Sequence, residues 1–246
     1  MASAAFRFYA ELNDFLPPQR RQREFACRYA QDATVKHMIE ALGVPHTEVA
    51  LILLNGAPAG FGQRLHDGDR VAVYPRFASL DPGALPQLGP APPQPPRFIA
   101  DAHLGGLARL LRMAGFDTLY DNHCGDGEIE AIAARDGRIV LTRDRELLKR
   151  RQVVHGCYLH AQQPPRQLRE VAGRFALSEA ARPFTRCLDC NRPLRTAARA
   201  EVEARLPPSV RARHDRFSTC DSCRRVYWKG SHWQRMRAAL QQALPP

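Results

Sequence analysis

The four cysteines near the C-terminus are arranged as two CxxC pairs. Cys187 and Cys190 form the first pair, Cys220 and Cys223 form the second, and 29 residues separate the pairs. Each pair can place two thiolates at neighbouring corners of a tetrahedron, so the quartet completes a closed site with no position left for water. The spacing therefore predicts structural zinc. Iron fits the same ligands, and a redox dithiol is the alternative that a single CxxC would leave open.

Acidic residues stand at a second set of chemically suggestive positions. Asp101 and Asp144 each follow an apolar run, and Asp126 and Glu128 open a helix predicted between them. Clustered carboxylates repel unless a cation neutralises them, and three or four oxygen ligands suit magnesium or manganese. Such an ion activates water and stabilises charge on a phosphoryl group. Taken singly, an aspartate at a helix start is also an ordinary N-cap.

The segment that carries these acids alternates between short apolar stretches and helices over residues 98–177. Four such repeats predict an α/β fold with a parallel sheet flanked by helices. In that architecture ligands bind beyond the carboxyl ends of the strands. Strands at 98–101 and 138–142 would bring Asp101 and Asp144 to one edge of the sheet.

Two further modules flank this α/β region. Residues 78–97 are rich in proline and almost uncharged, which predicts a stiff linker. Residues 1–77 show a strand hairpin, a helix and two more strands, the order of a β-grasp domain. We therefore expect a β-grasp domain over 1–77, the sheet domain over 98–183, and a zinc ribbon with a C-terminal helix over 184–246.

The formal net charge of +11 lies in the C-terminal part of the chain. Residues 97–246 hold 27 Lys or Arg against 16 Asp or Glu, whereas residues 1–77 hold 9 against 8. Clustered cations favour a polyanionic partner such as RNA, because binding releases counterions from the phosphates. The alternative is a set of solvated faces in an arginine-rich protein. No apolar run of about 18 residues or signal peptide appears, so we expect a cytoplasmic protein with no membrane partner.

Several sequence blocks resemble a known family. FIADAHLGGLARLLRMAGFDTLYDN, DGEIEAIAARDGRIVLTRDRELLKRR and the blocks around both cysteine pairs resemble the PIN-like RNase family named after the C-terminal domain of the mutator-seven exoribonuclease. The resemblance covers nearly all of residues 97–240. It implies metal-dependent cleavage of RNA, with catalytic acids at Asp101, Asp126, Glu128 and Asp144. Asp101 and Asp144 would bind the metal, and either Asp126 or Glu128 would be the third ligand.

The N-terminal domain resembles a different group. LILLNGAPAGFGQRLHDGDRVAVYP resembles the sulfur carriers and the ubiquitin-like domain fused ahead of certain PIN-like RNases. Sulfur carriers end in a free Gly-Gly, whereas here Tyr74-Pro75-Arg76-Phe77 leads into the linker. We therefore expect this domain to bind a protein partner or act as a scaffold.

The zinc-binding segment carries features of an RNA-binding surface. From residue 184 onward it holds 13 Lys or Arg against 5 acids, with aromatic side chains beside the second cysteine pair. Bases stack on aromatic rings and phosphates pair with arginine, although a small ribbon also needs aromatics for its core. Five residues are the predicted RNA contacts: Arg143, Arg224, Arg225, Trp228 and Lys229.

Two functions from different classes remain after this reading. The leading hypothesis is a ribonuclease that hydrolyses phosphodiester bonds of single-stranded RNA, with structural zinc and catalytic magnesium or manganese. The alternative is a non-catalytic RNA-binding adaptor that keeps the fold and the zinc ribbon. An adaptor has no need to retain Asp101, Asp126 and Asp144 together.

Overall fold

The computed structural model describes residues 2–75 and 88–244 and divides into two compact units. The first unit comprises Met1–Pro93 with Asp126–Tyr158, and the second comprises Gln94–Gly125 with Leu159–Pro246. The start of the predicted linker, residues 78–87, lies outside the described residues. The domain boundaries given above stay predictions.

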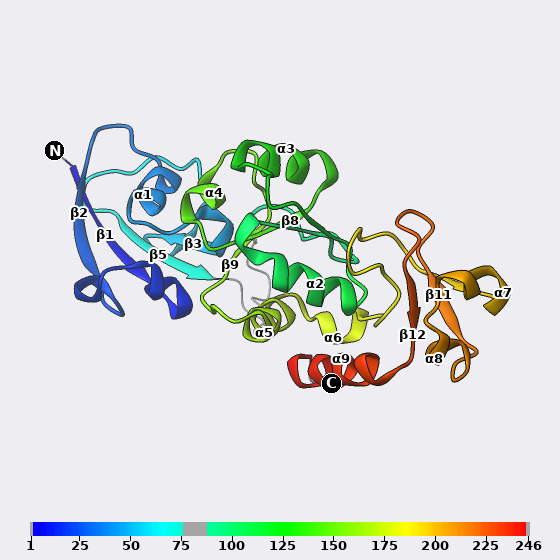
Figure 1. The fold of residues 1–246 in the computed structure, drawn as a ribbon. Coiled ribbons are helices and arrows are strands. Elements are labelled where there is room, and N and C mark those ends of the chain that lie inside the picture. Colours follow the sequence, from blue (N-terminus) through cyan, green and yellow to red (C-terminus); the bar gives the residue numbers. More distant parts are fainter. Residues whose placement is uncertain (1, 76–87, 245–246) are drawn as a thin grey trace. The chain divides into compact units, whose positions relative to one another are not determined.

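The N-terminal part of the first unit is a β-grasp fold, as predicted (Figure 1). Its five-stranded sheet has the order β2-β1-β5-β3-β4, with β1 and β2 antiparallel and β1 parallel to β5. Alternate side chains of β1 and β5 enter a core that includes Phe6, Phe8, Ile52 and Val73. The elements are β1 (Ala2–Phe8), η1 (Ala10–Phe15), η2 (Pro18–Arg20), β2 (Phe25–Tyr29), α1 (Val35–Ala41), η3 (His46–Glu48), β3 (Val49–Leu54), β4 (Ala57–Pro58) and β5 (Arg70–Pro75).

Helix α1 shows how local sequence sets an element's ends. The Thr34 side chain accepts the His37 backbone N–H at 3.2 Å and caps the first turn. Gly43, with φ of 98°, reverses the chain just beyond the last turn, where other residues would be strained. Ile39 on the inner face is fully buried against the sheet.

Parallel strands alternating with helices follow, which confirms the predicted α/β class. β6 pairs with β7 in parallel within the second unit, and β8 pairs with β9 in parallel within the first. Every residue of β6 and β8 is buried, as expected for strands covered on both faces. The elements are β6 (Phe98–Ala100), η4 (Ala102–Leu104), α2 (Gly105–Met113), β7 (Thr118–Tyr120), α3 (Asp126–Asp136), β8 (Ile139–Thr142), α4 (Arg145–Lys149), β9 (Gly156–Tyr158), α5 (Pro164–Phe175) and α6 (Leu177–Ala180).

Helices α2 and α5 pack closely within the second unit. Leu107 and Leu111 of α2 and Leu168 of α5 are fully buried. Gly106 permits the approach, because a Cβ at this position would lie 2.7 Å from Cγ of Pro164. An alanine there would have to displace the first turn of α5.

The C-terminal region is a three-stranded antiparallel ribbon followed by a helix, again as predicted. The strand order is β10-β11-β12, and helix α9 packs on α5 of the same unit (Figure 1). The buried core between strands and helices is small: Ala197, Val202, Leu206 and Phe217. The elements are β10 (Arg195–Ala197), α7 (Arg199–Val202), η5 (Glu203–Arg205), α8 (Pro208–Arg211), β11 (Phe217–Thr219), β12 (Val226–Trp228) and α9 (Ser231–Ala243).

Within the first unit, the β-grasp fold contacts β9 through a buried carboxylate. Glu48 is 3% exposed, and its Oε1 accepts the backbone N–H of Tyr158 at 2.8 Å. Beside it, the Phe15 and Tyr158 rings meet edge to face at 5.1 Å, and the Arg145 guanidinium lies over both. Arg145 also donates to the Phe15 carbonyl at 3.0 Å. The β-grasp fold therefore packs on α4 and β9 through specific polar and aromatic contacts.

Removing the Glu48 carboxylate is expected to destabilise this unit. Glu48→Ala would leave the Tyr158 N–H without its acceptor in a buried place, which costs about 1–3 kcal/mol. Glu48→Gln keeps an acceptor oxygen and should cost less. Urea unfolding measures both, with exposed Glu11→Ala as the control. Equal midpoints for Glu48→Ala and Glu11→Ala would show that the contact contributes nothing.

Candidate functional site

The sulfur atoms of the four cysteines converge in the second unit. Their Sγ atoms all lie within 4.8 Å of one another, with 3.4 Å between Cys187 and Cys223 and 3.3 Å between Cys190 and Cys220. Four thiolates at about 2.3 Å from one zinc ion stand about 3.8 Å apart, so the quartet fits a tetrahedral metal. The described residues contain no other group of three or more His, Cys, Asp or Glu side chains whose ligand atoms come this close together.

Both cysteine pairs sit in turns of the same backbone geometry. The N–H of Asn191 donates to the Cys187 carbonyl at 3.1 Å, and the N–H of Arg224 donates to the Cys220 carbonyl at 2.9 Å. Asn191 and Arg224 have φ of 64° and 62°, which is left-handed backbone. Asparagine tolerates this conformation, whereas arginine is strained in it. The second turn therefore carries backbone strain at Arg224 that the first turn, with Asn191 in the same position, largely avoids.

Arg224→Asn is accordingly expected to stabilise the ribbon by about 1 kcal/mol, because asparagine adopts left-handed backbone more readily than arginine. Arg192→Asn is the matched control, since Arg192 is exposed in the first turn and its φ is not positive. Thermal unfolding of the zinc-loaded protein measures both variants. An unchanged or lower midpoint for Arg224→Asn would refute the strain argument.

The electrostatics of the quartet favour a thiolate at Cys187. Burial opposes the charged form, but the backbone N–H of Cys190 and the Tyr227 hydroxyl outweigh it and lower the pKa of Cys187 to about 6. The Tyr227 oxygen lies 3.1 Å from Cys187 Sγ and also accepts the Leu188 N–H at 3.2 Å. Thiolate is the metal-binding form of cysteine, so this environment suits a cation.

Arg112 of α2 joins the first cysteine turn to the parallel strands of the same unit. Its side chain is 6% exposed. Nε donates to the Thr118 carbonyl at 2.9 Å, and Nη1 donates to the Leu188 and Asp189 carbonyls at 3.2 and 2.7 Å. Burial lowers the pKa of Arg112. This role could not be predicted from the sequence, because an arginine within a helix is usually a surface residue.

Asn191 makes a second connection between the same parts. Its Oδ1 accepts the Thr118 N–H at 3.0 Å, and its Nδ2 donates to Asp117 Oδ1 at 2.7 Å. The asparagine thus serves both the left-handed turn and the end of β7. The ribbon and the β6–β7 pair are consequently one packed structure within the second unit.

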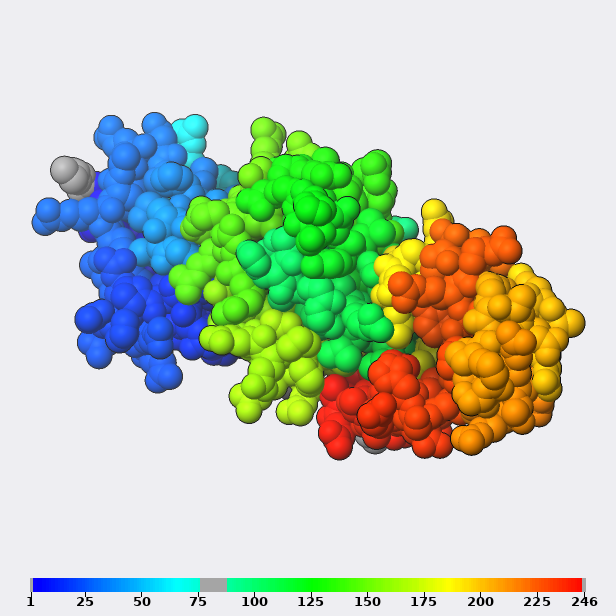
Figure 2. All heavy atoms as spheres, in the orientation of Figure 1, coloured from blue at the N-terminus to red at the C-terminus, as the bar shows by residue number. Residues whose placement is uncertain are grey.

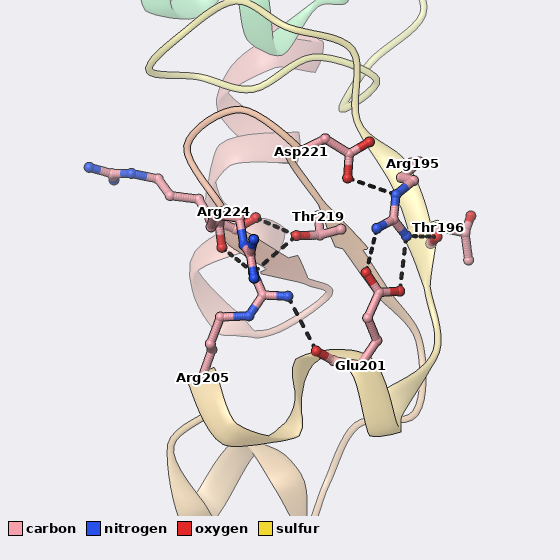
Figure 3. Close-up of polar contacts among 8 residues, drawn as sticks. Arg195, Thr196, Glu201, Arg205, Thr219, Asp221 and Arg224 are labelled. Atoms are coloured by element: carbon pink, nitrogen blue, oxygen red, sulfur yellow. Dashed lines mark hydrogen bonds and ion pairs between the residues drawn. The ribbon is translucent and has the colours of Figure 1, made fainter.

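A further polar cluster supports the second cysteine turn (Figure 3). Arg195 of β10 donates to Glu201 at 2.9 Å and to Asp221 at 2.8 Å, and Figure 3 shows its guanidinium between the two carboxylates. Arg205 donates to the Arg224 carbonyl. The hydrogen bond from Arg195 lowers the pKa of Glu201. These two arginines are thus engaged inside the ribbon.

Four of the predicted RNA contacts lie in the ribbon and differ in their surroundings. Arg225 forms an ion pair with Asp189, whereas Arg224 and Lys229 are exposed and pair with no carboxylate of the described residues. Trp228 is half-buried and packs against the ribbon core. Arg225 is therefore the residue of this set most occupied by a protein contact.

Two of the predicted catalytic acids act as helix caps. Asp101 follows β6, and its Oδ1 accepts the Ala102 N–H at 2.6 Å. Asp144 follows β8 after one residue and is exposed, and its Oδ1 accepts the Glu146 N–H at 2.8 Å. Asp144 Oδ2 accepts no hydrogen bond from the described residues. Capping therefore uses only the Oδ1 oxygen of Asp144, and among the described residues no donor binds the Oδ2 oxygen.

The other two acids lie in the first turn of α3. Asp126 Oδ2 is 3.7 Å from Nη2 of Arg150, which also pairs with Glu130 at 3.1 Å. Glu128 is exposed, with no ion pair or hydrogen bond to its side chain among the described residues. Arg143, the predicted phosphate contact, is likewise exposed and forms no ion pair with another described residue. Asp126 is thus partly neutralised by a cation, and Glu128 is not.

Two family models match the chain. Residues 96–240 match the model of a family described as the Mut7-C RNAse domain, which is more than half of the chain. The chain belongs to this family. Residues 1–81 match a second family, described as Mut7-C ubiquitin. The Mut7-C assignment confirms both resemblances inferred from the sequence and indicates a nuclease-like protein.

Solved structures similar to this Mut7-C chain cover only a third of it. A small archaeal modifier protein 1 from Haloferax volcanii is 23% identical, covering 31% of this chain and 100% of its own, with a TM-score of 0.26. A second structure of that protein, SAMP1, is 20% identical and covers 32% of this chain and 100% of its own, with a TM-score of 0.27. A putative molybdopterin converting factor, subunit 1, from Pyrococcus furiosus is 20% identical and covers 31% of this chain and 100% of its own, with a TM-score of 0.25. No curated protein matches the chain.

No helix of this Mut7-C protein, within the residues that the structure describes, is both long enough and apolar enough to cross a bilayer.

Proposed function

We propose that the chain is a metal-dependent ribonuclease that hydrolyses phosphodiester bonds of single-stranded RNA. The observation that carries this proposal is the match of residues 96–240 to an RNAse family, together with the positions of Asp101 directly after β6 and Asp144 after β8. In parallel α/β folds the carboxyl ends of strands are where ligands bind. A cytoplasmic location and a protein partner for the β-grasp domain remain predictions.

The acids have the chemistry that a hard divalent cation requires. Magnesium and manganese prefer carboxylate oxygens and keep several waters, and the ion would supply Lewis acidity toward a phosphoryl oxygen and lower the pKa of a water. Asp101 and Asp144 would be ligands, with Asp126 or Glu128 as the third. Asp144 offers an exposed carboxylate whose cap bond fixes its orientation. The Arg150 contact would orient Asp126 in the same way.

Neighbouring side chains would handle the substrate. Arg143 is exposed beside Asp144 and can pair with a phosphate of the RNA backbone. Asp126 and Glu128 differ in their surroundings, since Arg150 lies beside Asp126 only. The guanidinium would compete with a metal ion for the Asp126 carboxylate, so these contacts give no preference between Asp126 and Glu128 as the third ligand.

The zinc quartet takes no part in this chemistry. Four thiolates fill a tetrahedral ion, so no position remains for substrate or water. The ribbon instead contributes a folded surface next to strand β7, through Arg112 and Asn191. We infer that its role is to hold RNA.

The proposal is tested by incubating labelled single-stranded RNA with purified protein in manganese, in magnesium, and without divalent cations. Cleavage that requires one of the two ions is the expected result. The competing adaptor hypothesis is favoured by the capping roles of Asp101 and Asp144, which give both acids a structural use. It predicts RNA binding without cleavage in every condition, and that outcome would reject the nuclease.

A further inference from the structure

A large groove opens on the zinc ribbon, and none of the four acids lines it. Its volume is about 1150 Å³, and its walls come from the ribbon strands, the segment before the first cysteine turn, and the first turns of α9. All these residues belong to the second unit, and Figure 2 shows α9 (red) beside the ribbon (orange). Pockets for one small ligand are usually about 300–1000 Å³. This groove is therefore large enough for an extended chain.

The charge of the groove is entirely basic. Arg213, Arg216 and Lys229 line it, together with His214, His232 and Arg186, which pairs with Asp117, and the lining contains no aspartate or glutamate. The first three are exposed, and none of them pairs with a carboxylate among the described residues. Elsewhere in the ribbon, arginines such as Arg195 and Arg225 are neutralised by acids. Arg213, Arg216 and Lys229 thus stand in the groove without a protein counter-charge, and an anionic ligand would supply it.

The aromatic side chains of the groove offer faces for stacking. Trp228 and Trp233 both line it and are half-exposed. The Trp233 ring rests on Phe184 at 5.1 Å, with Lys229 Nζ at 5.4 Å from its centroid. Trp228 lies against Gly230, where an added Cβ would come within 3.0 Å of the indole nitrogen. The Arg237 guanidinium also lies 5.5 Å from the Trp233 centroid, so both rings are held in place by their neighbours.

We propose that this groove binds single-stranded RNA, with the phosphates on Arg213, Arg216 and Lys229 and the bases stacked on Trp233 and Trp228. Cations that follow a backbone beside aromatic platforms are the chemistry that single strands require. A duplex hides its base faces and would use only the cations. An acidic peptide would likewise use the cations but would leave the two indoles without stacking partners. The inference deepens the proposed ribonuclease function by assigning where its substrate is held.

The two tryptophans make the test direct, because the chain contains no others. A single-stranded uridine octamer is titrated into the zinc-loaded protein without added divalent cations, and intrinsic fluorescence is followed together with the anisotropy of a labelled octamer. The octamer is expected to quench the tryptophans to saturation as the anisotropy rises. An eight-base-pair RNA duplex should bind at least about tenfold more weakly, since its bases cannot stack on protein rings.

Variants identify the contacts. Replacing Arg213, Arg216 and Lys229 together by Gln should weaken octamer binding at least about tenfold and reduce the salt slope by about 0.7 per cation. The matched control replaces Arg166, Arg192 and Arg235 by Gln, which removes the same charge from exposed positions outside the groove. Trp233→Ala should cost roughly 5- to 150-fold. Trp233→Phe keeps a ring against Phe184 and should retain most of the affinity.

The inference is overturned if both triple variants bind the octamer equally, if binding leaves tryptophan fluorescence unchanged, or if an acidic peptide quenches while the octamer does not. Its failure is distinct from failure of the nuclease proposal. A protein that binds the octamer in the groove but never cleaves RNA would reject the nuclease alone. A protein that cleaves normally with the groove triple variant would reject the groove alone.

Discussion

Asp144→Asn is expected to reduce metal-dependent RNA cleavage by about 100- to 1000-fold while leaving the fold intact. A lost metal contact removes roughly 3–4 kcal/mol of transition-state stabilisation. Asparagine has the same shape, so its side-chain oxygen can still accept the Glu146 N–H and cap α4. The variant therefore removes the negative charge of residue 144 and keeps the capping hydrogen bond. Initial rates of RNA cleavage in manganese, compared between the variant and the wild type, measure the effect of the charge. Asp101→Asn should behave alike, because Asp101 caps η4 in the same manner.

Glu146→Gln is the matched control for this substitution. Glu146 is an exposed carboxylate in the first turn of α4, two residues from Asp144, and it pairs only with Lys149 among the described residues. Its neutralisation changes the local charge as much as Asp144→Asn does. It should leave cleavage within about twofold. If Asp144→Asn and Glu146→Gln had equal effects, Asp144 would have no special role.

Zinc removal has the second large expected effect. The hydrophobic cluster of the ribbon holds four buried side chains, Ala197, Val202, Leu206 and Phe217, which is a small core for a segment of this size. Structural zinc contributes about 10–16 kcal/mol of binding free energy in small zinc domains, which is folding free energy there. Cys220→Ser or a chelator should therefore unfold residues 184–230. The buried Arg112 would lose its acceptors at Leu188 and Asp189, so α2 should loosen as well.

Hydrogen exchange followed by mass spectrometry, together with measured zinc content, tests this expectation. Peptides from the ribbon should lose protection and those from β1 and β5 should keep it. Cys124→Ser is the control, since Cys124 stands outside the quartet. A Cys220→Ser protein without zinc but with an unchanged exchange pattern would show that the ribbon does not need the metal.

The features that sequence predicted are those encoded locally. Each CxxC pair brings two sulfur atoms together by its spacing alone, so the two pairs were enough to predict the four-cysteine site. The period of apolar residues predicted the β-grasp fold and the parallel strands. Element ends were less accurate. The strands expected over 98–101 and 138–142 are β6 at Phe98–Ala100 and β8 at Ile139–Thr142, and the first ends early because Asp101 takes the cap position of η4.

The features that sequence did not predict depend on residues far apart in the chain. Arg112 reaches Leu188 across 76 positions, and Glu48 reaches Tyr158 across 110. No local pattern marks either side chain, because burial of a charged group is decided by what packs over it. The groove is a third example, since acids are missing from its walls although Asp215 is adjacent in sequence to His214.

Manganese binding, measured by the loss of the free-ion electron paramagnetic resonance signal, tests most directly whether acids from separate stretches hold one divalent cation. Zinc-loaded wild-type protein is compared with Asp101→Asn, Asp144→Asn and the Glu146→Gln control. Shared coordination predicts that wild type and control bind manganese alike and that each aspartate variant binds at least about tenfold more weakly. Equal manganese affinity in all four proteins would contradict it.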